Sequence, residues 1–413
     1  MYQGIKTVSF EEAVKVVKSG DRIHIHSVAC APQGLIQALC NRGRAGELRD
    51  VKLQHLHTEG SAPYAEAEFE GIFFLESYFV GSNVRKPTQE GYADYVPVHL
   101  SETQKLIRSG IHPVDVAMIQ VCPPDKHGFV SMGTSVDATL AAVQNAKTVI
   151  AVINPNVPRA WGDAIIKLSD IDIFCEDNTP LIEAHPATLT EQDIAIGKNV
   201  ASLIEDGATL QMGIGAIPNA VLSQLGNHKN LGIHTEMFAD GVLPLYEKGV
   251  VNNMNKKFDK GKIVSTFLMG SKRVYDFIDD NPGVAMMDVG YTNDPFIIAQ
   301  QPKMTAINSA LSVDITGQVN ADSLGIKFYS GSGGQLDFIR GAAASEGGKP
   351  IIALPAVTNK GVSKICPTLL NGAGVVTTRF DVHYIVTEFG IADLYGKTLQ
   401  ERAKWKIHGT SKN

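Results

Sequence analysis

The 413-residue chain has few cysteines, little excess of either charge and no long apolar run. Its five cysteines stand singly without a CxxC pair, which argues against a disulfide framework and favours a reduced compartment. The net charge is −6 and the basic residues are scattered, which argues against nucleic acid or an anionic membrane as the main partner. No apolar run approaches the length of a membrane span. The start, MYQGIKTVSFEEAV, resembles neither a signal peptide nor a transit peptide. We therefore expect a cytoplasmic protein, and a mature mitochondrial form is also compatible.

Hydrophobic residues make up 44% of the chain and charged residues 19%, a balance typical of globular proteins in water. A chain of this length exceeds one ordinary hydrophobic core and indicates two domains. The Pro-containing, turn-rich stretch NTPLIEAHPATLTEQ is the expected linker. We therefore divide the chain into an N-terminal domain, 1–183, and a C-terminal domain, 184–413.

Two segments of the chain share one design. Ser9 and Glu12 form a capping-box pattern before apolar residues at helical spacing, Gly20 ends the predicted helix, and RIHIHS alternates as a strand. EQDIAIGKNVASLIEDG and ATLQMG repeat this order, with Gly207 as the helix stop. Further pairs follow in the same sequence: DKHGFVS with DITGQVN, KTVIAVINP with KPIIALPAV, and DIDIFCE with DVHYIVTE. The series indicates an internal duplication, and it predicts two related α/β domains with mainly parallel sheets.

The tripeptide HTE ends an apolar run in each half, at 57–59 and at 234–236. Both copies place a glutamate where ligands of parallel sheets bind, beyond the carboxyl end of a strand. Only the second half adds glycine-rich loops, GIGAIPNA and YSGSGGQLDF, where the first half has SVACAPQG and VSMGTSVDAT.

These loops can present backbone N–H groups to a phosphate or an oxyanion. Each motif alone is also compatible with a tight turn or a flexible loop. Together they favour Glu236 over Glu59 as the functional carboxylate.

Histidines on two predicted strands suggest a second kind of site. His24 and His26 share one strand face, as do His55, His57 and Glu59, a spacing that could present ligands to zinc. Histidines on half-buried strands are more often hydrogen-bonded side chains, and the glycine loops lie in the other half. We expect no metal, and a metallohydrolase stays open as an alternative.

With GIGAIPNA, HTEMFADG, NSALSVDITGQVN, GSGGQLDF and VTEFGIADLYGKTLQERA in this order, the chain resembles the acetyl-CoA hydrolase/transferase family of class I CoA-transferases. The pattern is similar to that of 4-hydroxybutyrate CoA-transferases and butyryl-CoA:acetate CoA-transferases. The resemblance implies two related α/β domains, a homodimer, and no cofactor beyond coenzyme A as cosubstrate and covalent carrier. The end KWKIHGTSKN departs from the family pattern, and we expect this departure to change the C-terminal packing and a dimer contact.

The resemblance also implies roles for individual residues. Glu236 matches the catalytic glutamate that becomes a glutamyl-CoA thioester, and the backbone N–H groups of Ile217 and Gly331 match the oxyanion donors. The resemblance implies that both oxyanion donors, Ile217 and Gly331, also contact coenzyme A. The other implied contacts are Gly213, Ile214, Gly215, Ala216, Asn308, Gly333, Gly334 and Lys349.

The predicted reaction is transfer of coenzyme A between a short-chain acyl-CoA, such as acetyl-CoA, and a carboxylate such as 4-hydroxybutyrate or butyrate. An acetyl-CoA hydrolase that uses the same glutamate is the main alternative. A non-catalytic module that senses sugar phosphates also stays open, because fold alone does not determine function.

Overall fold

The computed structural model describes residues 4–185 and 188–408. It contains two compact units: Met1–Ala184 with Thr266–Gly290, and His185–Ser265 with Tyr291–Asn413. The chain leaves the first unit after Ala184, within the stretch expected as the linker. Residues 186–187 of this stretch lie outside the described residues. The segment 266–290 belongs with the first unit, although it follows the second HTE in the sequence.

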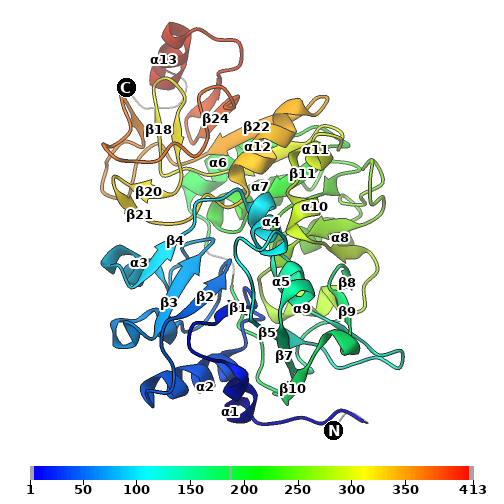
Figure 1. Ribbon diagram of the computed structural model, residues 1–413. Helices are drawn as coiled ribbons and strands as arrows, with labels where there is room; N and C mark the ends of the chain where they lie inside the picture. The colour runs from blue at the N-terminus through cyan, green and yellow to red at the C-terminus, as the bar shows by residue number, and fades with distance from the viewer. Residues whose placement is uncertain (1–3, 186–187, 409–413) are drawn as a thin grey trace. The chain divides into compact units, whose positions relative to one another are not determined.

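The first unit contains a seven-stranded sheet in the order β10-β7-β5-β1-β2-β3-β4, and every pairing in it is parallel (Figure 1). The inner strand β5 (Val116–Val121), between β7 and β1, is buried along its whole length, as expected for a continuous apolar strand between two covered faces. The other strands of the unit are β1 (Arg22–Ile25), β2 (Val51–His55), β3 (Phe73–Ser77), β4 (Ala93–Tyr95), β6 (Phe129–Ser131), β7 (Thr148–Ile153), β8 (Trp161–Gly162), β9 (Ile165–Lys167), β10 (Ile173–Glu176), β15 (Phe267–Leu268) and β16 (Val284–Met286).

The helix predicted from Ser9 onward is shorter than its pattern indicates. Ser9 Oγ accepts a hydrogen bond from the Glu12 N–H at 3.2 Å, but the α-helix ends at Ala13 and continues only as a 3₁₀ turn, Val14–Val16. Valines lose side-chain freedom in a helix, and here Val14 and Val17 are buried in the core instead. The helices of the unit are α1 (Phe10–Ala13), α2 (Gln33–Arg44), α3 (Arg85–Glu90), α4 (Thr103–Arg108), α5 (Thr139–Asn145) and α9 (Lys272–Ile278).

The second unit contains a six-stranded sheet in the order β12-β11-β17-β22-β24-β25. All its pairings are parallel except the last, where β25 (Gly390–Asp393) returns antiparallel to β24 (Tyr384–Thr387). The other strands of the unit are β11 (Thr209–Met212), β12 (Gly232–Ile233), β13 (Met237–Phe238), β14 (Ile263–Ser265), β17 (Thr305–Asn308), β18 (Ser312–Asp314), β19 (Val319–Asn320), β20 (Ser323–Leu324), β21 (Lys327–Phe328), β22 (Lys349–Ala353) and β23 (Ile365–Cys366).

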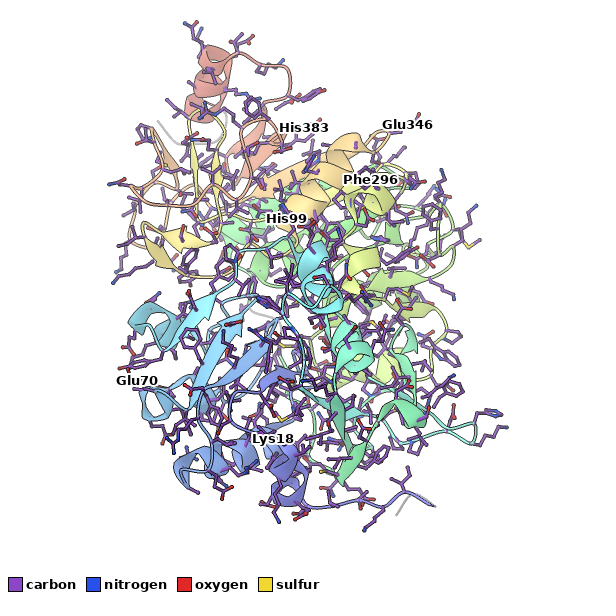
Figure 2. All side chains as sticks on the ribbon, viewed as in Figure 1. Lys18, Glu70, His99, Phe296, Glu346 and His383 are labelled. Atoms are coloured by element: carbon purple, nitrogen blue, oxygen red, sulfur yellow. The ribbon has the colours of Figure 1, made fainter. Side chains whose placement is uncertain are left out.

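Helices α6 (Glu191–Ala201) and α11 (Pro295–Ile298) of the second unit begin with a side-chain cap. Thr190 and Asp193 form a reciprocal capping box at the start of α6, which confirms the predicted helix. Its predicted end at Gly207 is wrong, because the helix stops at Ala201 with Ser202 as the C-cap. The short helix α11 buries Ile298 and leaves the Phe296 side chain 81% exposed (Figure 2). The remaining helices are α7 (Ala216–Gln224), α8 (Leu243–Glu247), α12 (Gln335–Ala344) and α13 (Leu399–His408), and α10 (Val289–Thr292) spans the return of the chain from the first unit.

The two sheets share one strand order. In chain order, β1, β2, β5, β7 and β10 of the first unit correspond to β11, β12, β17, β22 and β24 of the second, and both sets are arranged 5-4-3-1-2. Three of the repeated pairs fall on these strands: RIHIHS with ATLQMG on β1 and β11, KTVIAVINP with KPIIALPAV on β7 and β22, and DIDIFCE with DVHYIVTE on β10 and β24. The predicted α/β class and internal duplication are therefore confirmed.

Two simpler expectations concern the chain as a whole. All five cysteines are free thiols. Among the helices that the structure describes, none combines the length and the apolar character required to cross a bilayer.

Candidate active site

The carboxyl edge of the second sheet collects most of the predicted functional residues. Because β11, β12 and β17 are parallel, the segments that follow them leave the sheet at the same edge. The loop 213–217 follows β11, the second HTE follows β12, and Asn308 is the last residue of β17. Parallel pairing thus brings together segments that are far apart in the sequence.

The backbone of the second HTE is fixed on both sides. Thr235 Oγ1 donates to the Met212 carbonyl at 2.8 Å and accepts from the Met212 N–H at 3.2 Å, which ties the tripeptide to the end of β11. Ser265 Oγ donates to the Glu236 carbonyl at 2.8 Å. The Glu236 side chain, by contrast, is only half-buried. A half-buried carboxylate on a fixed backbone suits a group that must meet a ligand.

Two neighbours define the position of the Glu236 carboxylate. Asn293 Nδ2 donates to Glu236 Oε2 at 2.8 Å. A Cβ atom added to Gly334 would lie 2.0 Å from the same oxygen, so only glycine leaves room for the carboxylate there. Gly334 is the N-cap of α12, and a helix amino terminus carries a partial positive charge that stabilises an anion.

Asn293 was not among the predicted site residues. It lies in the stretch GYTND, directly after α10, and it is fully buried. The stretch follows no strand, and the duplicated series of segments contains no counterpart to it. Its proximity to Glu236 arises from tertiary folding across 57 positions of sequence.

The loop before α12 is anchored at its start. The N–H groups of Tyr329 and Ser330 both donate to the Asp322 carbonyl, at 2.7 and 3.0 Å. Gly331 is buried, and Gly333 has a φ of +55°. Of the three glycines predicted here, Gly334 is the one whose backbone borders the Glu236 carboxylate.

The loop before α7 is built around Gly215. Its φ of +114° lies in the region that favours glycine, and it forms the N-cap of the nine-residue helix without a side-chain cap. The first-turn N–H groups of α7, which include those of Ala216 and Ile217, therefore lack the usual side-chain acceptor. Ile214 is 43% exposed and Ile217 is buried. An uncapped helix amino terminus at a sheet's carboxyl edge is suited to an oxyanion or a phosphate.

Asn308 and Lys349 lie at opposite edges of the sheet. Asn308 ends β17, and its amide donates to Gln211 Oε1 at 3.0 Å. Lys349 begins β22 and pairs with Thr305, the first residue of β17. The Lys349 Nζ contacts the Glu205 carboxylate, and hydrogen bonds from Lys303 and Lys349 lower the pKa of Glu205 to about 2. The structure therefore does not bring Lys349 to the edge where Glu236 lies.

The first HTE has different surroundings. His57 Nε2 lies 2.8 Å from Glu59 Oε1, and Gln33 Nε2 donates to the Glu59 carbonyl at 2.9 Å. The glutamate of the first copy is thus engaged by the histidine of its own tripeptide. Glu236, in contrast, is held by the amide of Asn293.

The histidines weighed as zinc ligands each have a separate protein partner. The ring Nε2 atoms of His24, His26 and His55 lie 3.1, 2.9 and 2.9 Å from Thr139 Oγ1, the Ser135 carbonyl and the Tyr64 hydroxyl. Burial lowers the pKa of His24 to about 4 and that of His55 to about 3, so both rings are neutral near pH 7. Within the described residues, no group of three or more His, Cys, Asp or Glu side chains could hold a metal ion.

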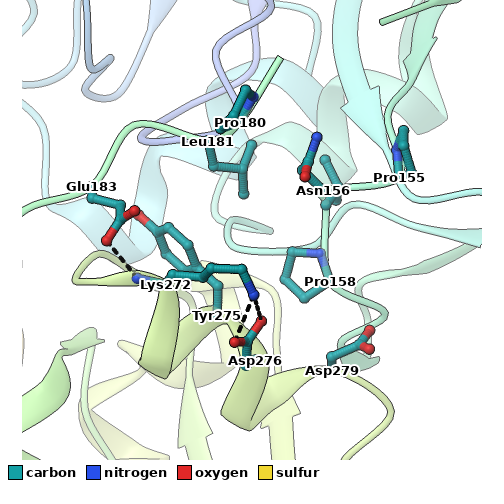
Figure 3. A pocket seen from close by; sticks show the side chains of 11 residues that line it. Pro155, Asn156, Pro158, Pro180, Leu181, Glu183, Lys272, Tyr275, Asp276 and Asp279 are labelled. Atoms are coloured by element: carbon teal, nitrogen blue, oxygen red, sulfur yellow. Dashed lines mark hydrogen bonds and ion pairs between the residues drawn. The ribbon is translucent and has the colours of Figure 1, made fainter. Parts of the chain in front are cut away.

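A cavity of about 150 Å³ lies in the first unit, between the chain that follows β7 and β10 and helix α9 (Figure 3). Its polar wall groups are already paired with one another. Glu183 accepts from the Lys272 N–H at 2.7 Å, the Lys272 side chain contacts Asp276, and the Tyr275 hydroxyl donates to the Ile182 carbonyl at 2.7 Å. These pairings engage Glu183, Lys272 and Tyr275 within the protein, and none of the predicted site residues lines the cavity.

Known proteins provide a separate line of evidence. Models of the acetyl-CoA hydrolase/transferase N-terminal and C-terminal domains match residues 2–183 and 270–408. A succinyl-CoA:acetate/propanoyl-CoA:succinate CoA transferase of Fasciola hepatica is 51% identical, over 95% of this chain and 82% of the relative. A 4-hydroxybutyrate coenzyme A transferase of Clostridium kluyveri is 46% identical, over 98% of this chain and 94% of the relative. The crystal structure of RipA from Yersinia pestis is similar with a TM-score of 0.93 at 36% identity, over 98% and 94% of the two chains.

Proposed function

Because the chain belongs to the acetyl-CoA hydrolase/transferase family, we propose that it transfers coenzyme A between a short-chain acyl-CoA and a carboxylate, with Glu236 as the covalent carrier. The observation that carries this proposal is the position of Glu236. Its carboxylate lies at the carboxyl edge of a parallel sheet, beside the amino terminus of α12 and the amide of Asn293. The acyl donors and acceptors we propose are acetyl-CoA with 4-hydroxybutyrate or butyrate.

The reaction proceeds through two activated intermediates. Glu236 attacks the thioester carbonyl, the carbon–sulfur bond breaks, and coenzyme A leaves as a thiolate, which gives an acyl-glutamyl anhydride. The thiolate then attacks the glutamyl carbonyl, which releases the first carboxylate and leaves a glutamyl-CoA thioester on the enzyme. The second carboxylate reverses these steps and leaves as the new acyl-CoA. Because one product leaves before the second substrate reacts, the kinetics are ping-pong.

Each step places negative charge on a carbonyl oxygen, and loss of one donor to such an oxygen typically costs about 10²–10³ in rate. We assign this stabilisation to the backbone N–H groups of Ile217 and Gly331. The uncapped amino terminus of α7 supports the first of these assignments. Asn293, whose amide already bonds Glu236 Oε2, is a third donor to the reacting carboxyl group.

The coenzyme A site comprises the two glycine-rich loops and one strand end. The loop 213–217 is proposed for the phosphate-bearing part of coenzyme A because its glycines permit close backbone approach. Lys349 is left out of the proposed site because it lies at the other edge of the sheet. The residues assigned to coenzyme A are Gly213, Ile214, Gly215, Ala216, Ile217, Asn308, Gly331, Gly333 and Gly334.

Hydrolysis is the second candidate function, because water could attack either activated intermediate in place of a carboxylate. The family to which the chain belongs includes hydrolases by its description. The balance between the two reactions depends on how well water is excluded during turnover. Measuring free thiol against new acyl-CoA in the presence of acetate separates them.

Covalent labelling tests the proposal. Wild-type protein incubated with acetyl-CoA alone should gain the mass of coenzyme A less one water, and peptide mass spectrometry should locate the adduct on Glu236. Glu236→Gln, which keeps the shape of the side chain, should gain no mass. The matched control is Glu59→Gln in the first HTE, which should still form the adduct on Glu236. An adduct on another residue, or a labelled Glu236→Gln protein, would show that the carrier is misassigned.

Three further features belong to the proposal. We place the protein in the cytoplasm, which the five free cysteines support because a reducing compartment keeps thiols unpaired. We propose that it acts as a homodimer, which light scattering after size exclusion would measure. We propose that it requires no cofactor beyond coenzyme A, and exhaustive chelation should therefore leave transfer unchanged.

A further inference from the structure

His234, the first residue of the second HTE, forms a hydrogen bond with the Thr292 carbonyl. Its ring is fully buried, and Nε2 lies 2.8 Å from the Thr292 carbonyl oxygen. A carbonyl oxygen only accepts hydrogen bonds, so Nε2 must carry the hydrogen. Burial and the nearby charge of Lys256 lower the pKa of His234 to about 3. The ring is therefore a neutral donor with one defined tautomer across the physiological range.

The acceptor of this bond belongs to the peptide unit that leads into Asn293. The Thr292 carbonyl and the Asn293 nitrogen share one planar group, so fixing the oxygen fixes the orientation at which Asn293 begins. Asn293 in turn donates to Glu236 Oε2 at 2.8 Å. A continuous series of two hydrogen bonds and one rigid peptide thus connects His234 to the reacting carboxylate.

The His234 ring also contacts the elements on either side of this series. Its centroid lies 6.2 Å from that of Tyr291 and 6.3 Å from that of Phe338. Tyr291 precedes Thr292, and Phe338 lies in the first turns of α12, whose N-cap Gly334 borders Glu236. Packing between Tyr291 and Phe338 holds the ring in the orientation that directs Nε2 to the Thr292 carbonyl.

The first HTE shows how the equivalent histidine is bonded in the absence of a peptide corresponding to Thr292–Asn293. His57 bonds directly to the glutamate two residues later. In the second copy the histidine is directed to the Thr292 carbonyl, and Asn293 takes the place beside the glutamate. The Glu236 carboxylate thus has a neutral amide at Oε2, where the first copy has a histidine.

From this geometry we propose that His234 is a positioning residue for the covalent step: it holds the Thr292–Asn293 peptide so that the Asn293 amide sets the orientation of the Glu236 carboxylate. The inference rests on the proposed function of Glu236. It assigns His234 no contact with substrate and no proton transfer. Its role is expressed entirely through Asn293.

Two substitutions separate the hydrogen bond from the bulk of the ring. His234→Gln keeps an N–H donor at a reach similar to that of Nε2, whereas His234→Leu removes the donor. We expect His234→Leu to lower kcat and the rate of Glu236 labelling by about 10- to 100-fold, as for a reacting group displaced by up to 1 Å. KM for acyl-CoA should change little, because the proposed coenzyme A contacts lie on other segments. His234→Gln should recover most of kcat.

A double-mutant cycle with Asn293→Ala tests the route of the effect. Asn293→Ala alone should lower kcat by about 10²–10³, as for loss of a donor to the reacting group. If His234 acts through Asn293, adding His234→Leu to this variant should cost less than about 3-fold more. The matched control is His228→Leu, which removes a ring hydrogen bond to another backbone carbonyl of the same unit, that of Ile204 at 3.1 Å. It should leave kcat per folded molecule unchanged.

The possible failures are distinguishable. Independent, multiplicative effects of the two substitutions would overturn the positioning role, as would a His234→Gln protein that is folded but as slow as His234→Leu. Thermal unfolding of every variant shows whether lost activity reflects lost fold, and labelling of the folded fraction alone keeps the comparison valid. If instead the wild-type protein forms no adduct on Glu236, the proposed function itself fails before His234 is tested.

Discussion

Replacing Gly334 with alanine tests the site with a single methyl group. An added Cβ would lie 2.0 Å from Glu236 Oε2 and 2.3 Å from Asn293 Nδ2, whereas such contacts essentially never fall below 3.0 Å. The carboxylate must therefore retreat by about 1 Å. A displacement of that size at a reacting group costs about 10²-fold in rate, or about 2.7 kcal/mol in the barrier.

The substitution should leave the fold nearly intact. Gly334 has a φ of −90°, which alanine adopts without strain, and exchanging glycine for alanine at an N-cap costs about 1 kcal/mol. We therefore expect kcat for transfer from acetyl-CoA to fall about 10²-fold while the thermal unfolding midpoint changes by only a few degrees.

The assay is the initial rate of acyl-CoA formation together with the rate of the covalent adduct on Glu236, by intact-protein mass spectrometry. Gly226→Ala is the matched control, because a Cβ atom there meets nothing within 4 Å. It should retain wild-type rates. A folded Gly334→Ala protein with wild-type labelling would refute the placement of the reacting carboxylate against α12.

Two further predictions concern stability. Lys256 is fully buried, and burial lowers its pKa in the folded protein to about 7, from the ordinary value of 10.5. Between these two pH values the unfolded chain holds a proton on Lys256 that the folded protein has lost. The free energy of unfolding should therefore rise with pH over this range. Compared with Lys256→Met, the wild-type protein should gain free energy of unfolding as pH rises from about 7, and urea titrations that show a constant difference would contradict this. Buried Asp137 accepts three hydrogen bonds, from Ser135 Oγ at 2.7 Å and from the Thr139 N–H and Oγ1 at 2.8 and 2.9 Å. Asp137→Ala leaves these donors without their acceptor and should cost about 3 kcal/mol, so calorimetry that detects no destabilisation would count against it.

The fold and the candidate position of Glu236 could be predicted from the sequence because both depend on local strand patterns. Strand periodicity and the repeated segments locate the strands, and parallel pairing then places whatever follows them at one edge. Glu236 lies three residues after Ile233, the end of β12, and could be located this way. The two glycine loops follow the same logic.

The rest depends on contacts that no local pattern encodes. Asn293 reaches Glu236 because a segment outside the repeated units folds back onto it, and the only local signal is an asparagine in a turn-like stretch. Lys349 was assigned by resemblance alone. Its position at the start of β22, paired with Thr305, puts it at the opposite edge of the sheet from Asn308. The early end of α1 likewise reflects burial of valines, which outweighs a well-formed cap.

The shared order of five strands has an evolutionary consequence. A shorter coding sequence was copied and fused, and each descendant inherited a glutamate after its second strand. In the proposed function one nucleophile suffices for turnover, so selection had to retain reactivity in only one of them. The other was released from that constraint, and its contact with the neighbouring His57 ring records a different fate for the same ancestral tripeptide.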